Sequence, residues 1–131
     1  MKFKFGRSSL HNLSTCDDQL QRIMHLAITL TKYDFGIDCG VRTVEEQRAL
    51  VKKGASNTMN SLHLPNAFGE SEAVDIKVYV NGSITWDSKY FRKVAGAIFK
   101  AAFQLGIEIE WGGHWENLYD TPHFQLPKER K

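Results

Sequence analysis

The segment SLHLPNAFGESEAVDIKVYVNGSITW, residues 61–86, determines how the rest of this 131-residue chain can be arranged. Its second half carries an apolar run that includes Val74, Ile76 and Val78 and is typical of a strand. Asn81-Gly82 follows, and because both central positions of a type I′ turn need positive φ, the pair predicts a β-hairpin that returns through SITW. Asp75 is therefore expected near the start of the first strand.

Signals for two helices and a strand precede this hairpin. Apolar residues at helical spacing follow a Ser/Thr/Asp capping cluster and predict a helix over about 17–32. FGIDCGVR, residues 35–42, predicts a short strand or extended segment that ends at Arg42. In the following TVEEQRALVKKG, Thr43 and Glu46 form a capping box and Gly54 closes the helix.

The C-terminal third predicts a third helix and two more strands. Asp87 is expected to cap the helix and Gly106 to end it. IEIEW, residues 107–111, and HFQL, residues 123–126, predict short strands. The chain is therefore expected to be α+β, with about three helices and a small, mostly antiparallel sheet in one domain over residues 1–131.

Composition and charge exclude several classes of partner. The formal net charge is +2, and the 17 basic and 15 acidic residues form no basic stripe, so we expect no nucleic-acid partner. The N-terminus lacks an apolar signal region and no window approaches a membrane span, so we expect no membrane insertion and a cytoplasmic protein. Cys16 and Cys39 form no CxxC motif, so a cysteine zinc site is excluded, a structural disulfide is unsupported and buried free thiols are expected.

Two of the five histidines, His63 and His123, suggest a metal site together with Asp75. His25 falls on the polar side of the first predicted helix and His11 in an N-terminal loop, so both are expected to be solvated. A catalytic zinc site commonly uses three His or carboxylate ligands and leaves one position open. His63, Asp75 and His123 would satisfy that count from a loop, a strand start and a late strand.

The motif YDTPHFQL, residues 119–126, places a carboxylate near one of these histidines. Pro122 fixes its own φ and favours an extended Thr121, which constrains the relative direction of Asp120 and His123. A carboxylate held beside a metal site can serve as a general base. Glu110 is the alternative base.

Four motifs in one order resemble a known family. GVRTVEEQ, SLHLP…SEAVDI, EWGGHW and DTPHFQL occur as in zinc D-Ala-D-Ala carboxypeptidase-like peptidases, which include VanY-type carboxypeptidases and phage L-alanyl-D-glutamate endolysins. The resemblance extends from about Phe3 to Leu126, and FKFGRSS is similar to the phage branch. It implies a Hedgehog/D-Ala-D-Ala peptidase-like fold and zinc bound by His63, Asp75 and His123.

The same resemblance implies roles for other residues. Asp120 becomes the general base, and Arg42 binds a substrate carboxylate or stabilises the oxyanion, with a surface salt bridge as its alternative. Ser61 is expected to make loop hydrogen bonds that orient a ligand histidine. The family pattern HxxGxAxD is shorter than the segment between His63 and Asp75, so residues around NAFGE resemble a loop insertion.

Residues 110–115, EWGGHW, are expected at the substrate. Trp111 and Trp115 could form flat walls for a peptide or sugar, and core packing is an equal alternative for both. His114 is expected at the rim of the site and not as a ligand. Glu72 is nearer than Asp75 to His63 in sequence, but Asp75 occupies the matching AVDI frame.

The resemblance implies a zinc endolysin that hydrolyses the L-Ala–D-Glu bond in the stem peptide of bacterial peptidoglycan, and we expect it to be a monomer. It would reach the wall after holin-type permeabilisation of the host membrane. Two alternatives stay open: a D-Ala-D-Ala carboxypeptidase or dipeptidase acting on cell-wall precursors, and a non-catalytic zinc-stabilised binding domain.

Overall fold

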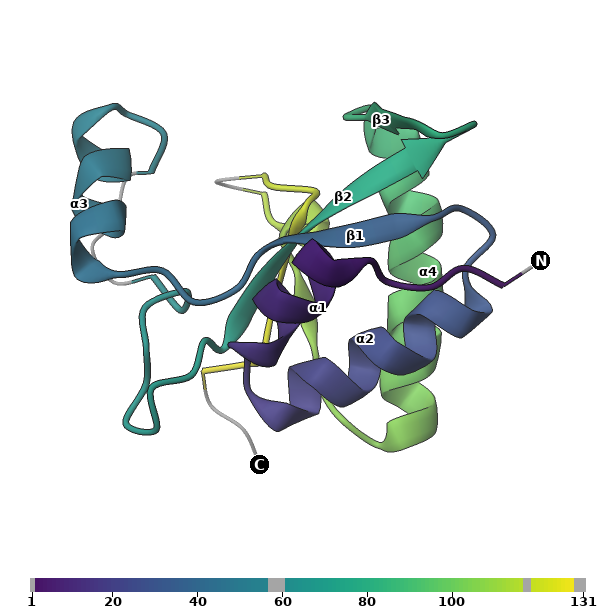
Figure 1. The fold of residues 1–131 in the computed structure, drawn as a ribbon, viewed down its shortest axis with the longest axis horizontal. Helices are drawn as coiled ribbons and strands as arrows, with labels where there is room; N and C mark the ends of the chain where they lie inside the picture. The colour runs from purple at the N-terminus through teal and green to yellow at the C-terminus, as the bar shows by residue number, and fades with distance from the viewer. Residues whose placement is uncertain (1, 57–60, 117–118, 129–131) are drawn as a thin grey trace.

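The computed structural model describes residues 2–56, 61–116 and 119–128 and contains helices packed with an antiparallel sheet (Figure 1). The helices are α1 (Arg7–Ser14), α2 (Asp18–Leu30), α3 (Val44–Lys52), α4 (Ser88–Leu105) and the short 3-10 helix η1 (Gly112–His114). The strands are β1 (Phe35–Cys39), β2 (Ala73–Val80), β3 (Ser83–Thr85), β4 (Glu110–Trp111) and β5 (His123–Gln125). This confirms the α+β class.

The central strand of the sheet is β2. The strand order is β1-β2-β5-β4, and β3 also pairs with β2. Strand β5 pairs with β2 at Ala73–Asp75 and β3 pairs with it at Val78–Val80, so the two short partners contact different halves of one long strand. Asn81 and Gly82 have φ of 52° and 81°, which confirms the predicted positive-φ hairpin turn.

Side-chain caps set the ends of the three longer helices. The Asp17 carboxylate accepts a hydrogen bond from the Gln19 N–H at the start of α2, and Asp87 does the same for Lys89 at the start of α4. Helix α3 has the predicted capping box between Thr43 and Glu46. These caps are local in sequence, which is why they could be predicted.

Helix α1 was not predicted, and the expectation that His11 lies in a loop is wrong. The segment RSSLHNLS has a weak apolar pattern and buries only Ser9 and Leu13. Its role is tertiary: Ser9 Oγ accepts the Ile37 N–H at 3.0 Å, and Asn12 Nδ2 donates to the Ile37 carbonyl at 2.8 Å. Helix α1 therefore provides hydrogen-bond partners for the outer side of β1.

Helices α2 and α4 pack against each other, and their apolar faces join one face of the sheet in the core (Figure 1). Fully buried core residues come from both the N-terminal and the C-terminal half of the chain, among them Leu13, Met24, Ile76, Ile98 and Leu126. Helix α3 lies apart from the sheet, beyond the C-terminal end of β1 (Figure 1).

Two strands are shorter than expected. Strand β1 ends at Cys39 and not at Arg42, and only Glu110–Trp111 of the 107–111 segment is a strand. Residues 57–60, which precede the 61–86 segment, lie outside the described residues. In the chain that is described, no helix combines the length and apolarity needed to cross a membrane.

Candidate metal centre

A row of polar side chains crosses the face of the sheet opposite the core. Because side chains alternate along a strand, β2 directs Val74 and Ile76 into the core and Asp75 to the other face. The strand register places His123 of β5 opposite Asp75 and Gln125 opposite Glu110 of β4. Residues far apart in sequence therefore form one polar row.

A bulge adds Cys39 to this row. Phe35 and Ile37 of β1 face the core, and in a regular strand Cys39 would follow them. The register shifts by one residue between Ile37 and Cys39, so that Cys39 is paired with Asp75. The chain then turns at Gly40 towards the loop that carries His63.

Both histidines face a single oxygen of Asp75. His63 Nε2 lies 3.2 Å and His123 Nδ1 lies 3.0 Å from Asp75 Oδ1. The rings of His63 and His123 are 5.2 Å apart between centroids and inclined at 73°. The structure thus brings together the three residues that the sequence proposed as metal ligands.

The remaining nitrogen of each histidine is hydrogen bonded to a group that fixes the ring. His63 Nδ1 lies 2.8 Å from the Gly40 carbonyl, which can only accept, so this nitrogen carries the proton. His123 Nε2 lies 2.8 Å from Gln125 Oε1. Such outer contacts orient histidines at metal sites, and they leave His63 Nε2 and His123 Nδ1 directed at Asp75.

Short loop contacts position His63, which is only 2% exposed. Its backbone N–H donates to Ser61 Oγ at 3.1 Å, which is one of the loop hydrogen bonds expected of Ser61. Its carbonyl accepts the Arg42 N–H at 2.7 Å. Within the segment that resembles an insertion, Asn66 Oδ1 accepts the N–H groups of Phe68 and Glu70, so these residues form their own hydrogen-bonded loop.

Arg42 lies at the edge of the cluster. Its Nη2 is 3.4 Å from Asp75 Oδ2, and its Nη1 donates to Gln47 Oε1 at 2.8 Å. The Arg42 side chain is 15% exposed, so one end of the guanidinium is held by protein groups while solvent can still reach it. Gln47, which is fully buried, was not anticipated from the sequence.

Asp120 lies at the open side of the cluster. One of its carboxylate oxygens lies within 4.8 Å of ligand atoms of Asp75 and His123. Desolvation of the Asp120 carboxyl and the nearby negative charge of Asp75 raise its pKa above the ordinary value. Glu110, the alternative base, instead accepts a hydrogen bond from Gln125 at 3.0 Å.

The EWGGHW residues divide between the core and the site. Trp111 is 6% exposed, donates from Nε1 to the Thr121 carbonyl at 2.7 Å and stacks on Phe124, as its core-packing alternative stated. Trp115 is half-buried, with its ring centroid 5.3 Å from that of His123. His114 is exposed and stacks on Phe99.

The sequence did not anticipate Cys39 at this site. Its Sγ, together with ligand atoms of His63 and Asp75, forms a group that could hold a metal ion, although no CxxC motif is present. Cys39 reaches the site through the bulge in β1, and the sequence FGIDCG contains no pattern that predicts this bulge. Cys16 is the other free cysteine; it is buried, and burial raises the pKa of its thiol to about 12. Glu72 accepts a hydrogen bond from Asn66, whereas Asp75 contacts both histidines.

Opposite effects act on the charges of His63 and Asp75. Burial lowers the pKa of His63, but hydrogen bonds and charge from Asp75 and Cys39 outweigh it and raise the pKa to about 9. Burial would raise the pKa of Asp75, but hydrogen bonds from His123 and His63 and their charges hold it well below the usual range. Without a metal, the site therefore favours a positive charge next to Asp75.

For the metal-free protein, we expect a loss of stability at alkaline pH. The folded-state pKa of His63 lies above its ordinary value of 6.5, so its stabilising effect is complete below pH 6.5 and is lost as pH rises through about 9. The melting temperature in chelator should fall by several degrees between pH 6.5 and 9.5. His63→Gln should reduce this fall, whereas His11→Gln, at an exposed helix position, should leave it unchanged. An equal fall in both variants would contradict the assignment.

The chain is similar to known proteins along most of its length. Residues 1–126 match the model of the phage L-alanyl-D-glutamate peptidase family. The chain belongs to that family. The L-alanyl-D-glutamate peptidase of Escherichia phage T5 is 34% identical over 96% of this chain and 99% of its own length.

Other members of this family are also similar. The crystal structure of the L-Ala D-Glu endopeptidase ChiX of Serratia marcescens matches with a TM-score of 0.86 and 35% identity, over 97% of this chain and 90% of that chain. The L-alanyl-D-glutamate peptidase of Listeria phage A118 is 38% identical over 66% of this chain, but the match spans only 28% of that longer relative.

Proposed function

We propose that this protein is a metallopeptidase that hydrolyses the L-Ala–D-Glu bond in the stem peptide of peptidoglycan. Family membership supports the reaction, because the T5 relative is an L-alanyl-D-glutamate peptidase and the match covers nearly the full length of both proteins. The observation that supports this site is the convergence of His63 and His123 on one oxygen of Asp75. The core draws on residues from Leu13 to Leu126, which supports a single catalytic domain.

The types of the donor atoms and two of their separations fit a zinc ion. Zinc binds histidine nitrogen and carboxylate oxygen at about 2.0–2.2 Å in tetrahedral sites, which spaces neighbouring donors roughly 3.4 Å apart. The 3.2 Å and 3.0 Å separations from Asp75 Oδ1 to His63 Nε2 and His123 Nδ1 are close to that value. We assign His63, Asp75 and His123 as ligands. Cys39 lies on the other side of the His63 ring, where its Sγ is 3.8 Å from His63 Nδ1 and 3.5 Å from Nη2 of the Arg42 cation.

Zinc bound there would act as a Lewis acid towards the scissile carbonyl and lower the pKa of the attacking water. Asp120 would take a proton from the attacking water and later give it to the leaving amine, a task suited to a carboxylate whose pKa is raised. Arg42 either stabilises the oxyanion or binds a carboxylate of the stem peptide. Trp115, beside His123, is positioned to contact the peptide.

The segment 112–115 holds Asp120 in position, and Gly112→Ala should test this. The Gly112 carbonyl accepts the Asp120 N–H at 3.1 Å, and a Cβ at Gly112 would overlap the Asp120 carbonyl oxygen. We expect peptidase activity to fall by about 100-fold through displacement of Asp120, with a smaller effect on zinc affinity. Gly96→Ala in α4, where a Cβ meets open space, is the control and should keep full activity. Full activity in Gly112→Ala would show that this contact does not position the base.

The reaction can be tested by mass spectrometry of soluble products. Zinc-loaded protein is incubated with purified Gram-negative peptidoglycan, with Asp120→Ala as control. Stem peptides that begin at D-Glu, absent from the control, would establish the endopeptidase. Release of D-alanine alone would assign the protein to the carboxypeptidase branch, and no products from folded, zinc-loaded protein would favour a binding domain.

The biological setting follows from this proposal. A peptidase of this specificity in a phage would lyse the host after holin-type permeabilisation of the membrane, acting as a monomer on the wall. Addition of the protein to cells whose outer and inner membranes have been permeabilised should clear the suspension, whereas addition to intact cells should not.

A further inference from the structure

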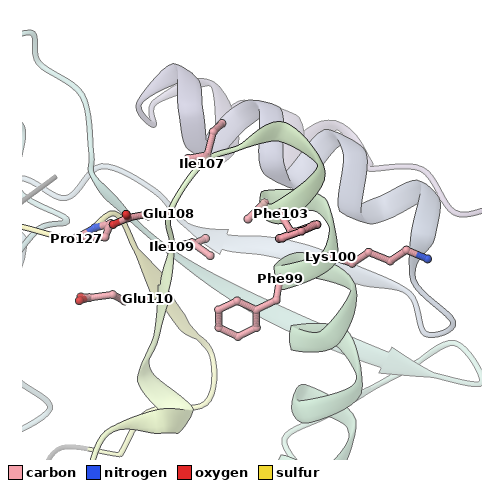
Figure 2. A pocket seen from close by; sticks show the side chains of 9 residues that line it. Phe99, Lys100, Phe103, Ile107, Glu108, Ile109, Glu110 and Pro127 are labelled. Atoms are coloured by element: carbon pink, nitrogen blue, oxygen red, sulfur yellow. The ribbon is translucent and has the colours of Figure 1, made fainter. Parts of the chain in front are cut away.

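The polar row continues past His123 to the edge of the sheet. Gln125 Oε1 lies 2.8 Å from His123 Nε2, and Gln125 Nε2 donates to Glu110 Oε1 at 3.0 Å. Glu110 is exposed and lines an open pocket beside α4, where its side chain and that of Glu108 point away from the helix while Ile109 points towards it (Figure 2). The mechanism above uses neither Gln125 nor Glu110.

Each group in this series restricts the next one. A carboxylate only accepts hydrogen bonds, so the amide nitrogen of Gln125 must face Glu110. The amide oxygen then faces His123, and because it also only accepts, His123 Nε2 must carry a proton. In a neutral ring this leaves the lone pair on Nδ1, the atom directed at Asp75.

The two ligand histidines are therefore held by different devices. His63 donates to the Gly40 backbone carbonyl, which cannot reverse its polarity. His123 donates to a side-chain amide, whose oxygen and nitrogen can exchange places by rotation. If Gln125 rotated, its NH₂ group would face His123 Nε2 and would favour the tautomer protonated on Nδ1, which cannot bind a metal through that atom.

We propose that Gln125 and Glu110 are positioning residues that fix the metal-binding tautomer of His123, with Glu110 setting the direction of the Gln125 amide. The proposal depends on the proposed function only for the assignment of His123 as a ligand. Strand pairing supports it, because the register keeps Glu110 directly opposite Gln125. Zinc affinity should therefore depend on an exposed carboxylate that does not contact the metal.

A double-mutant cycle on zinc affinity tests the series. The zinc dissociation constant is measured by competition with a chromophoric chelator, which needs no substrate. Gln125→Leu should weaken binding by about 10- to 100-fold, the range found for outer-shell partners. Glu110→Ala should weaken it by about threefold or more in the native background, but by less than twofold in the Gln125→Leu background, because no amide remains to be oriented.

Glu108→Ala is the matched control. Glu108 is an exposed acid on the same segment and should change affinity by less than twofold in either background. An equal effect of Glu110→Ala in both backgrounds would overturn the proposal, because it would mean that its charge acts on the site directly. So would an unchanged affinity in Gln125→Leu. Circular dichroism of each metal-free variant checks that it is folded.

The exchanged variant Glu110→Gln/Gln125→Glu gives a rescue. A carboxylate at position 125 accepts from His123 and from the amide at position 110, so the donor on His123 stays on Nε2. Affinity should return to within about threefold of native, and ¹⁵N NMR of histidine-labelled, zinc-loaded protein should again show a protonated Nε2 on His123. Failure of the exchange to restore both would overturn the proposal; zinc binding as expected without peptide cleavage would instead contradict only the proposed function.

Discussion

Asp120→Asn should lower turnover on peptidoglycan by about 100- to 10,000-fold while the zinc dissociation constant stays within about threefold of native. Asparagine keeps the size of the side chain and one acceptor oxygen, but it cannot take a proton from water. The Asp120 carboxylate lies within 4.8 Å of ligand atoms of Asp75 and His123, so one water molecule between them could pass a proton to it. Turnover is measured by release of soluble peptide at saturating substrate.

The zinc measurement distinguishes two roles for Asp120. The group formed by Asp75, Asp120 and His123 could itself hold a metal, so a large loss of zinc affinity in Asp120→Asn would make Asp120 a ligand and contradict its assignment as the base. Asp38→Asn, at an exposed position of β1, is the control and should retain turnover and affinity. Unchanged turnover in Asp120→Asn would leave the reaction without its proposed base.

Removal of the metal should have the other large effect. Treatment with a chelator should reduce activity by more than about 1000-fold, since the nucleophile and the polarised carbonyl both depend on the ion. Addition of zinc should restore activity and raise the melting temperature, because a ligand that binds only the folded protein stabilises it. Both changes are measured on the same preparation, with and without chelator.

Two histidine variants, one at a proposed ligand and one at an exposed position, link this effect to the site. His123→Ala should remove the zinc-dependent rise in melting temperature and the activity together, because it deletes one of the three proposed ligands. His25→Ala removes an exposed histidine from α2 and should behave like the native protein. If chelation left activity intact, or if His123→Ala still gained stability with zinc, the metal would have to lie elsewhere.

Features encoded by neighbouring residues could be predicted from the sequence. The Asn81-Gly82 turn, the Thr43–Glu46 capping box and the cap at Asp87 each depend on residues within a few positions of one another. The sequence also proposed His63, Asp75 and His123 as ligands, because ordered motifs carry a family resemblance that spacing alone does not supply. The register of β2 and β5, which places Asp75 opposite His123, explains how two of these residues come close together.

Features that depend on tertiary contacts could not be predicted. Helix α1 has little apolar pattern of its own and is stabilised where Ser9 and Asn12 contact Ile37. Cys39 reaches the polar face only because a bulge in β1 changes its pairing. The contact between Gln125 and Glu110 likewise depends on the pairing of β4 with β5. These two strands are separated in the sequence by residues 112–122, so their pairing could not be predicted from neighbouring residues.

The position of α1 has a consequence for behaviour at high concentration. Exposed sheet edges are templates for strand addition and aggregation, and proteins protect them by covering them or by keeping edge strands short. Ser9 and Asn12 occupy the outward N–H and carbonyl of Ile37 on one edge, and the strand at the opposite edge, β4, has only two residues. We therefore expect the native protein to resist edge-to-edge association as it accumulates, and substitutions at Ser9 or Asn12 to favour aggregation before they affect catalysis.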